Sequence, residues 1–260
     1  MKNKNRFKKE KDEKWNKFSL GIGILIIGIF IFMIHLFYLL LIGALTEFNL
    51  YLRWISLFLI YFGIVLHFIL IKDKPFSKSW DYIKKSRNFI WSIVIIFLIF
   101  SLIGFFVPAP NLLSEKIIEF LKNIINKTQG MSQIELIVFI FNNNLQASFL
   151  GLITGIILGI YPVVAAVVNG YLVGFVGVLS VNEGGFSVLL RLLPHGIFEL
   201  PAIFISLGMG IKLGTFIFQK KKLNAFKDFF WSSFQVFVFI VIPLLIFAAL
   251  IEGSLIAIFG

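Results

Sequence analysis

The sequence predicts an all-α polytopic membrane protein, a transmembrane helical bundle of about seven spans. Of its 260 residues, 59% are apolar and only 14% are charged, whereas soluble domains are near 45 to 50% apolar and about 25% charged. Since one span takes about 20 apolar residues, about seven spans with their connecting loops take up the 260 residues and leave no room for a separate soluble domain. The composition therefore excludes a soluble globular protein.

The N-terminal third is predicted to hold a basic cytoplasmic tail and two spans. Residues 1–17 carry eight Lys or Arg and three acids. The apolar run Phe18–Leu45 is too long for the core of a signal peptide, so we interpret it as an uncleaved first span. A second span is expected over Leu52–Ile71, and a basic cytoplasmic loop completes the region 18–88. Residues 89–260 are expected to form one membrane domain.

That domain is predicted to begin with a third span and an amphipathic helix. The third span, Phe89–Val107, ends where Pro108 and Pro110 break the helix. From 111 to 127, isoleucines and leucines recur on one face while acids, lysines and asparagines occupy the other. This pattern is typical of a helix that lies in the membrane interface.

Four further spans are expected in the C-terminal half. Their predicted bounds are Leu145–Gly159, Pro162–Ser180, Pro201–Ile211 and Phe230–Ile251. The fourth span, of 15 residues, is either short or continues through the asparagines at 142–144. Because two prolines and three ionisable residues interrupt the stretch before the sixth span, we expect a broken or re-entrant segment near 187–200.

Charge predicts the orientation of the chain. The segments 1–17, 72–87 and 212–227 hold 19 of the 24 Lys and Arg residues, and all three fall on one side if the spans alternate. The positive-inside rule then puts the N-terminus in the cytoplasm and the C-terminus outside, in a multi-pass protein of the cell membrane. We interpret the basic surplus as a topology signal that also attracts anionic lipids, and we expect no nucleic-acid partner.

The strongest candidate for a functional site is the group Arg191, His195 and Glu199. These residues follow at i, i+4 and i+8 and would form one polar stripe on an unbroken helix. Ionisable groups at membrane depth cost about 2.5 to 3.5 kcal/mol each on insertion scales, so they normally pair or line a wet cavity. One interpretation is a structural charge network. The other is functional, with His195 titrating and Glu199 as its partner in a proton relay or hydrolytic pair.

Amides and small residues give two further signals. Asn143, Asn144 and Asn169 are expected within or beside the hydrocarbon, where they either bond to neighbouring helices or contact a substrate. Glycines recur on the fourth and fifth spans, and the stripes include Gly151, Gly155 and Gly159 on the former and Gly170, Gly174 and Gly177 on the latter. We expect these two helices to pack tightly as a hairpin, with a glycine-lined permeation path as the alternative.

Other chemistries have no support in the sequence. Cysteine is absent, His195 and Glu199 occur without an HExxH pattern, and no phosphate-binding glycine loop or serine nucleophile elbow is present. We therefore expect no catalytic residues, no metal site and no cofactor. The chain is not expected to be an enzyme.

Three stretches carry a resemblance to a known family. They are FNNNLQASFLGLITGIILGI, VVNGYLVGFVGVL and LLPHGIFELPAIFISLGMGIKLG. Within the third, Pro194, His195 and Gly196 are followed by Glu199, Leu200, Pro201 and Ala202, and then by the turn from Gly210 to Gly214. From about residue 89 to 260 the chain resembles the stage II sporulation protein M family of polytopic membrane proteins.

The resemblance implies a membrane scaffold. In endospore formers, members of the family belong to a complex of the septal and engulfing membranes that holds a cell-wall-degrading module, while many relatives occur in organisms that do not sporulate. We therefore expect a scaffold or assembly factor that contacts membrane lipids and a partner protein, with homo-oligomerisation left open. The alternative is a transporter or channel for a small solute, ion or lipid that uses the Arg191, His195 and Glu199 cluster.

Overall fold

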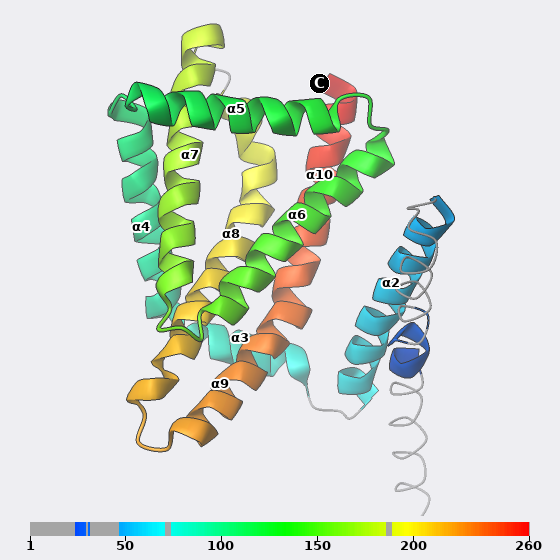
Figure 1. Ribbon diagram of the computed structural model, residues 1–260. Coiled ribbons are helices and arrows are strands. Elements are labelled where there is room, and N and C mark those ends of the chain that lie inside the picture. The colour runs from blue at the N-terminus through cyan, green and yellow to red at the C-terminus, as the bar shows by residue number, and fades with distance from the viewer. Residues whose placement is uncertain (1–23, 30, 32–46, 71–73, 186–188, 260) are drawn as a thin grey trace, which may run out of the picture. The chain divides into compact units, whose positions relative to one another are not determined.

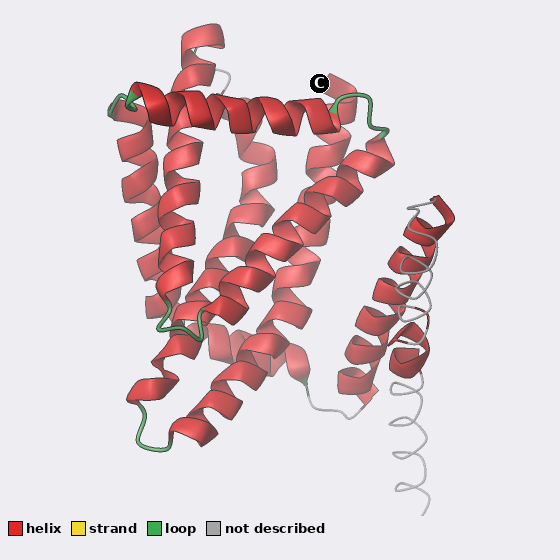
Figure 2. Ribbon diagram, viewed as in Figure 1, coloured by secondary structure: helices red, strands yellow, loops and turns green. Residues whose placement is uncertain are grey.

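The computed structural model describes residues 24–29, 31, 47–70, 74–185 and 189–259. Helices are the only regular elements in these residues (Figure 2), as the predicted all-α class requires. The chain divides into two compact units, Met1–Lys78 and Ser79–Gly260. In the first unit, helix α2 (Glu47–Leu70) contains the predicted second span, while the basic tail and most of the predicted first span lie outside the described residues.

The second unit is a helical bundle (Figure 1). Its helices are α3 (Pro75–Lys85, from Ser79 onward), α4 (Arg87–Phe106), α5 (Asn111–Thr128), α6 (Gln133–Thr154), α7 (Ile160–Gly184), α8 (Leu189–Gly214), α9 (Lys222–Val236) and α10 (Ile242–Phe259). A 3-10 turn, η2 (Thr215–Phe218), follows α8, and a π-helical segment, η3 (Phe237–Val241), joins α9 to α10 without a break.

Five helices among the described residues are long and apolar enough to cross a membrane. They are Arg87–Phe106, Gln133–Thr154, Ile160–Asn182, Gly196–Phe218 and Lys222–Ile256. The predicted number of seven spans is therefore not reached in the described part of the chain. In α2, only the shorter apolar stretch Ile55–Leu66 is found. The predicted fifth, sixth and seventh spans each lie within one of the five helices, and the predicted third span ends one residue beyond its helix, at Val107.

The fourth span differs from the shorter of its two predicted forms. It begins at Gln133 because Ser132 and Glu135 form a capping box: the Ser132 hydroxyl accepts from the Glu135 amide, and the Glu135 carboxylate accepts from the Ser132 amide. The helix then runs through the asparagines and ends at Thr154. The expected end at Gly159 is wrong, because Gly159 (φ 68°) adopts the left-handed conformation in the turn before α7.

The expected broken segment near 187–200 is not confirmed. The backbone is helical from Leu189 through Pro194 and Pro201 to Gly214. The stretch from 72 to 87, which the sequence suggested as a loop, is mostly the helix α3. Its alternating basic and aromatic residues suit an amphipathic helix.

Glycines set the helix pairing, although not in the expected hairpin of the fourth and fifth spans. A Cβ atom on Gly155, the residue that caps the C-terminus of α6, would lie 2.5 Å from the Cα of Gly210 on α8. One on Gly174 of α7 would lie 2.8 Å from the Phe105 amide on α4. Each glycine stripe therefore packs against a different partner, α6 on α8 and α7 on α4. Close backbone approach through small residues is the usual route to stable helix pairs in membranes.

The two ends of the bundle carry different charges. At one end lie α3, the start of α4 and the α8 to α9 connection, joined by a cation–π contact of 4.4 Å between the Lys212 amine and the Tyr82 ring. This end contains Lys84, Lys85, Arg87, Lys220, Lys221, Lys222 and Lys227. At the other end α5 lies across the spans (Figure 1). Two of the three basic segments that the sequence predicted to be cytoplasmic, represented by residues 79–87 and 212–227, thus lie at the same end of the second unit. The third, residues 1–17, lies outside the described residues.

Candidate binding cavity

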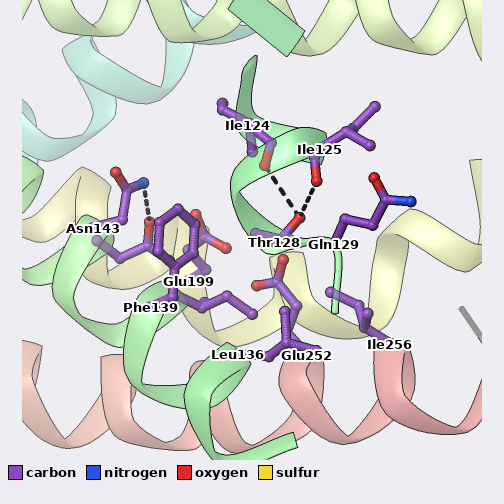
Figure 3. Close-up of a pocket in the computed structure, with 12 residues that line it drawn as sticks. Ile124, Ile125, Thr128, Gln129, Leu136, Phe139, Asn143, Glu199, Glu252 and Ile256 are labelled. Atoms are coloured by element: carbon purple, nitrogen blue, oxygen red, sulfur yellow. Dashed lines mark hydrogen bonds between the residues drawn. The ribbon is translucent and has the colours of Figure 1, made fainter. Parts of the chain in front are cut away.

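A cavity of about 520 Å³ lies at the α5 end of the bundle, between α5, α6, α8 and α10 (Figure 3). We call it the acidic cavity. Its apolar wall consists of Ile124, Ile125, Leu136, Phe139, Ile140 and Ile256, and its polar wall of Thr128, Gln129, Asn143, Asn144, Glu199 and Glu252. Among the described residues that line it, none is a lysine, arginine or histidine.

Two carboxylates from different helices face this space. Glu199 belongs to α8 and Glu252 to α10, and Figure 3 shows both side chains directed into the cavity. Both belong to helices long and apolar enough to cross a membrane. Two carboxyl groups from different helices thus share one partly apolar cavity.

The asparagines of α6 complete the polar wall. The Asn143 amide donates to the Asn144 carbonyl oxygen at 3.5 Å. Asn144 is only 8% exposed, so its amide is largely enclosed by the helices around the cavity.

The cavity exists because α6 and α8 diverge toward α5 (Figure 1). At their close end, the Ser206 hydroxyl of α8 donates to the Ser148 carbonyl of α6 at 2.7 Å, and both residues are buried. One turn beyond Asn144 the helices are therefore already in contact. At the wide end α10 enters between them, where Gly253 packs on Ile137 and the Gln133 amide donates to the Ser254 hydroxyl at 3.1 Å. The acidic cavity is a pocket with a closed floor.

The structure brings together three of the predicted polar residues, Glu199, Asn143 and Asn144, and separates a fourth. Asn169 is exposed on α7 and donates to the Ala165 carbonyl of its own helix at 2.7 Å. The side chains of Arg191, His195 and Pro194 lie outside the described residues. Pro201 and Gly196 are on α8 beside Glu199, where a Cβ on Gly196 would meet only the Leu200 side chain at 3.6 Å.

Sequence reasoning missed Glu252 as a site residue. The predicted last span ends at Ile251, which leaves Glu252 just outside it. The structure continues α10 to Phe259, so that Glu252 lies inside an apolar helix. The available signal was the run AALIEGSLIAIF, in which one carboxylate is surrounded by apolar residues on both sides. An ionisable residue within a span is by itself a functional hypothesis.

The comparison with protein families concerns the same helices. The model of the stage II sporulation protein M family matches residues 93–255, which is more than half of the chain and includes every element that lines the cavity. The chain belongs to the stage II sporulation protein M family. The match confirms the family suggested by the PHG and ELPA motif on α8, and it extends from the middle of α4 into α10.

Two relatives of this family member are proteins of Methanocaldococcus jannaschii that are described as uncharacterized. One is 28% identical over 126 residues, which cover 48% of this chain and 55% of the relative. The other is 33% identical over 118 residues, covering 44% of this chain and 66% of the relative. The matches therefore span about half to two thirds of these relatives. No solved structure matches the chain.

In this stage II sporulation protein M family member, the cavity offers two kinds of interaction. Its carboxylates can hold a cation and its amides can donate to an oxygen, while the isoleucines and phenylalanine accept an apolar group. Within the described ranges no group of three or more His, Cys, Asp or Glu is arranged to hold a metal ion.

Proposed function

We propose that this family member is an integral membrane scaffold of the cell membrane that recruits or anchors a partner protein. The single observation that supports this most is α5, an amphipathic helix laid across one end of the bundle (Figure 1). Ile117 is its only buried residue, and its contacts with the spans are few. A helix that uses so little of its surface for contacts within the bundle leaves most of it available to another protein.

The polar face of α5 is the proposed docking strip. Glu115, Glu119 and Lys122 follow at i, i+4 and i+7 and are exposed, so they lie on one side of the helix. One flank holds Leu113 and Phe120, which are 41% and 51% exposed. In the interface this flank would rest in lipid, which directs the charged strip toward water.

The rigidity of the bundle also supports a scaffold. The α6–α8 and α4–α7 pairs are joined through glycines on which no added Cβ atom would fit. Helices packed this closely move as units, because separating them loses many backbone contacts at once. A scaffold needs such a fixed platform. The expectation that the chain is not an enzyme remains part of this proposal.

The test is recovery of a partner from native membranes by full-length protein and two charge-reversed variants. Glu115→Lys with Glu119→Lys should lose a protein that the natural chain retains. Asp81→Lys reverses an exposed acid on α3, at the opposite end of the bundle, and should retain it. Recovery of the same proteins, in the same amounts, with all three chains would contradict the scaffold proposal.

A transporter is the second candidate, and the acidic cavity favours it. Carriers bind their substrates in polar cavities between spans. The closed floor between Ser148 and Ser206 requires α6 and α8 to separate before a solute could cross. Flux of a solute through the purified protein in vesicles, lost in Glu199→Gln, would support the transporter over the scaffold.

A further inference from the structure

We propose that the basic end of the bundle binds anionic phospholipid. Lys85 and Lys212 would hold one lipid phosphate, and the lysines of the α8–α9 tip, residues 218–223, would hold others. The occupant is the membrane leaflet at that end and not a soluble phosphate. This inference goes beyond the scaffold and does not depend on it, because it concerns the end of the bundle opposite α5 (Figure 1).

The basic end carries a surplus of positive charge. Residues 79–87 and 212–228 contain eight lysines or arginines and two acids. One of the acids, Asp81, lies 3.8 Å from the Lys84 amine of its own helix. Six positive groups remain even if both acids are paired. Residues 1–17 cannot neutralise them, because that segment itself holds eight Lys or Arg and three acids. A partner that fits this surface is therefore anionic.

The position of α3 puts this charge at the level of lipid head groups. Helix α3 ends at Lys85, and the apolar span α4 begins only two residues later, at Arg87. Trp80 and Trp91 lie on either side of this junction and are 50% and 60% exposed. Tryptophan prefers the interface between hydrocarbon and water. Helix α3 therefore lies where the chain enters the membrane.

The two faces of α3 differ in the way that a surface-bound helix requires. Ser79 and Ser86 are buried, and Tyr82 between them packs on the core of the bundle. These three residues follow at i, i+3 and i+7, which is one side of a helix. Lys84 and Lys85 are exposed. A helix that is anchored on one face and basic on the other is suited to a membrane surface.

Lys212 gives this surface a fixed point. It is half-buried in the last turn of α8, and its amine lies 4.4 Å from the centre of the Tyr82 ring and 5.5 Å from that of Phe229. Cation–π attraction to the two rings holds the amine in place. Because an ammonium has three donors, it can still donate to a phosphate oxygen. Lys85 follows Tyr82 at i+3 on α3, so the two are neighbours on the helix surface and one phosphate can contact both lysines.

The α8–α9 tip combines lysines with exposed apolar side chains. Lys220, Lys221 and Lys222 are exposed. Phe218 and Leu223, on either side of them, are 76% and 67% exposed. In a membrane such apolar groups leave water, while the lysine amines stay at the level of the phosphates. This combination favours a lipid surface over an acidic protein in solution.

The first test measures which lipid the full-length protein retains. Protein is extracted from bilayers of equal phosphatidylglycerol and phosphatidylethanolamine, and bound lipid is counted by native mass spectrometry. Both lipids contain a phosphate, but only phosphatidylglycerol has a net negative charge. The natural chain should retain phosphatidylglycerol about fivefold or more over phosphatidylethanolamine, because several lysines attract its charge.

Two sets of variants assign this preference to named lysines. The tip variant carries Lys220→Gln, Lys221→Gln and Lys222→Gln, all at exposed positions, and should lower the preference about threefold or more. Lys85→Gln with Lys212→Gln should have a similar effect. Lys212→Arg should keep the preference, because arginine stays charged and also stacks on aromatic rings.

The matched control carries Lys116→Gln, Lys122→Gln and Lys127→Gln on α5. It removes the same charge as the tip variant, also from exposed positions but at the opposite end of the bundle, and should retain lipid as the natural chain does. Melting temperatures of all variants in detergent distinguish a loss of lipid from a loss of the fold.

Three outcomes would overturn the proposal. The first is equal retention of the two lipids by the natural chain. The second is a preference that both basic-end variants keep, or that the α5 control loses equally. The third is an acidic protein that the natural chain recovers from native membranes and the tip variant loses, with the lipid preference unchanged, since the surface would then serve a protein. The docking test of the scaffold depends on Glu115 and Glu119, so either proposal can fail without the other.

Discussion

The two halves of the α6–α8 pair show how one pair of helices can be both a fixed joint and a binding site. In the half that begins at Ser148, small residues bring the backbones into contact, and the Ser206 hydroxyl bonds across at 2.7 Å. In the half toward α5, Asn144 and Glu199 line a cavity instead. The close glycine contacts between α6 and α8 therefore set the angle at which the two helices diverge, and this divergence makes room for the acidic cavity.

The largest expected effect is a difference in thiol labelling between the α5 end and the α9 end of the bundle, which should lie on opposite sides of the membrane. Asn123 on α5 and Lys221 before α9 are both exposed, and the chain has no native cysteine. Asn123→Cys should react with a membrane-impermeant thiol reagent in intact cells, while Lys221→Cys should react only after permeabilisation. This is the orientation that the positive-inside rule predicts. Reaction of both from outside would contradict a bundle that spans the membrane.

The next largest effect, on stability, is expected from disrupting the close packing of α8 against α6. Gly210→Ala would put a Cβ atom against the Gly151 carbonyl, which belongs to a helix backbone and cannot move aside. The free energy of unfolding should fall by at least about 2 kcal/mol, measured as a lower melting temperature from tryptophan fluorescence in detergent.

The control for this change is Gly196→Ala in the same helix. The added methyl group there would meet only the Leu200 side chain at 3.6 Å. It should be neutral, or stabilise α8 by up to about 1 kcal/mol through helix propensity. Equal losses in the two variants would mean that glycine is required by the helix and not by the contact with α6.

A smaller effect is expected from the hydrogen bond at the closed floor of the cavity. Ser206→Ala removes the buried bond to the Ser148 carbonyl and should lower the free energy of unfolding by about 1 kcal/mol. Ser92→Ala removes an exposed bond within α4, from the Ser92 hydroxyl to the Asn88 carbonyl, and should have little effect. If the two changes are equally mild in thermal melts, the floor is held by packing alone.

The smallest effect is expected in the pH dependence of stability at the basic end of the bundle, where Tyr82 lies. Burial, with the negative charge of Asp228, outweighs a nearby Ser233 hydroxyl and raises the pKa of Tyr82 to about 12. Above pH 10 a tyrosine in the unfolded chain loses its proton, whereas Tyr82 in the folded chain keeps its proton to about pH 12. Its contribution to stability is therefore present below pH 10 and lost as the pH rises through this window.

Tyr82→Phe should consequently lose less stability between pH 10 and 12 than the natural chain does. Melting temperatures across this range measure the difference, and Tyr161→Phe, at an exposed position, is the control. The hydroxyl of Tyr82 donates only a long bond of 3.5 Å to the Phe229 carbonyl, so the two variants should be similar at neutral pH. Identical alkaline profiles would show that Tyr82 is not buried against α9.

Much of the fold could be predicted from local patterns. The runs of apolar residues in α4, α7 and the last span, the two prolines after α4 and the amphipathic period of α5 are all properties of neighbouring residues. The start of α6 was missed because Ser132 and Glu135 form a capping box within a stretch judged by hydropathy alone. The same emphasis on hydropathy ended the last span before Glu252.

The sequence by itself determined the all-α membrane class, the separation of basic and acidic segments and the choice of Glu199 as a candidate site residue, since burial cost and periodicity depend only on residue type and order. Only the tertiary structure decided that α6 pairs with α8 rather than with α7. A glycine stripe in the sequence indicates that another helix packs closely there, but it does not indicate which helix. The tertiary structure alone brought Glu252 beside Glu199 and turned Asn169 outward. Those outcomes depend on helix rotation and crossing angle, which are set by contacts between residues far apart in the chain.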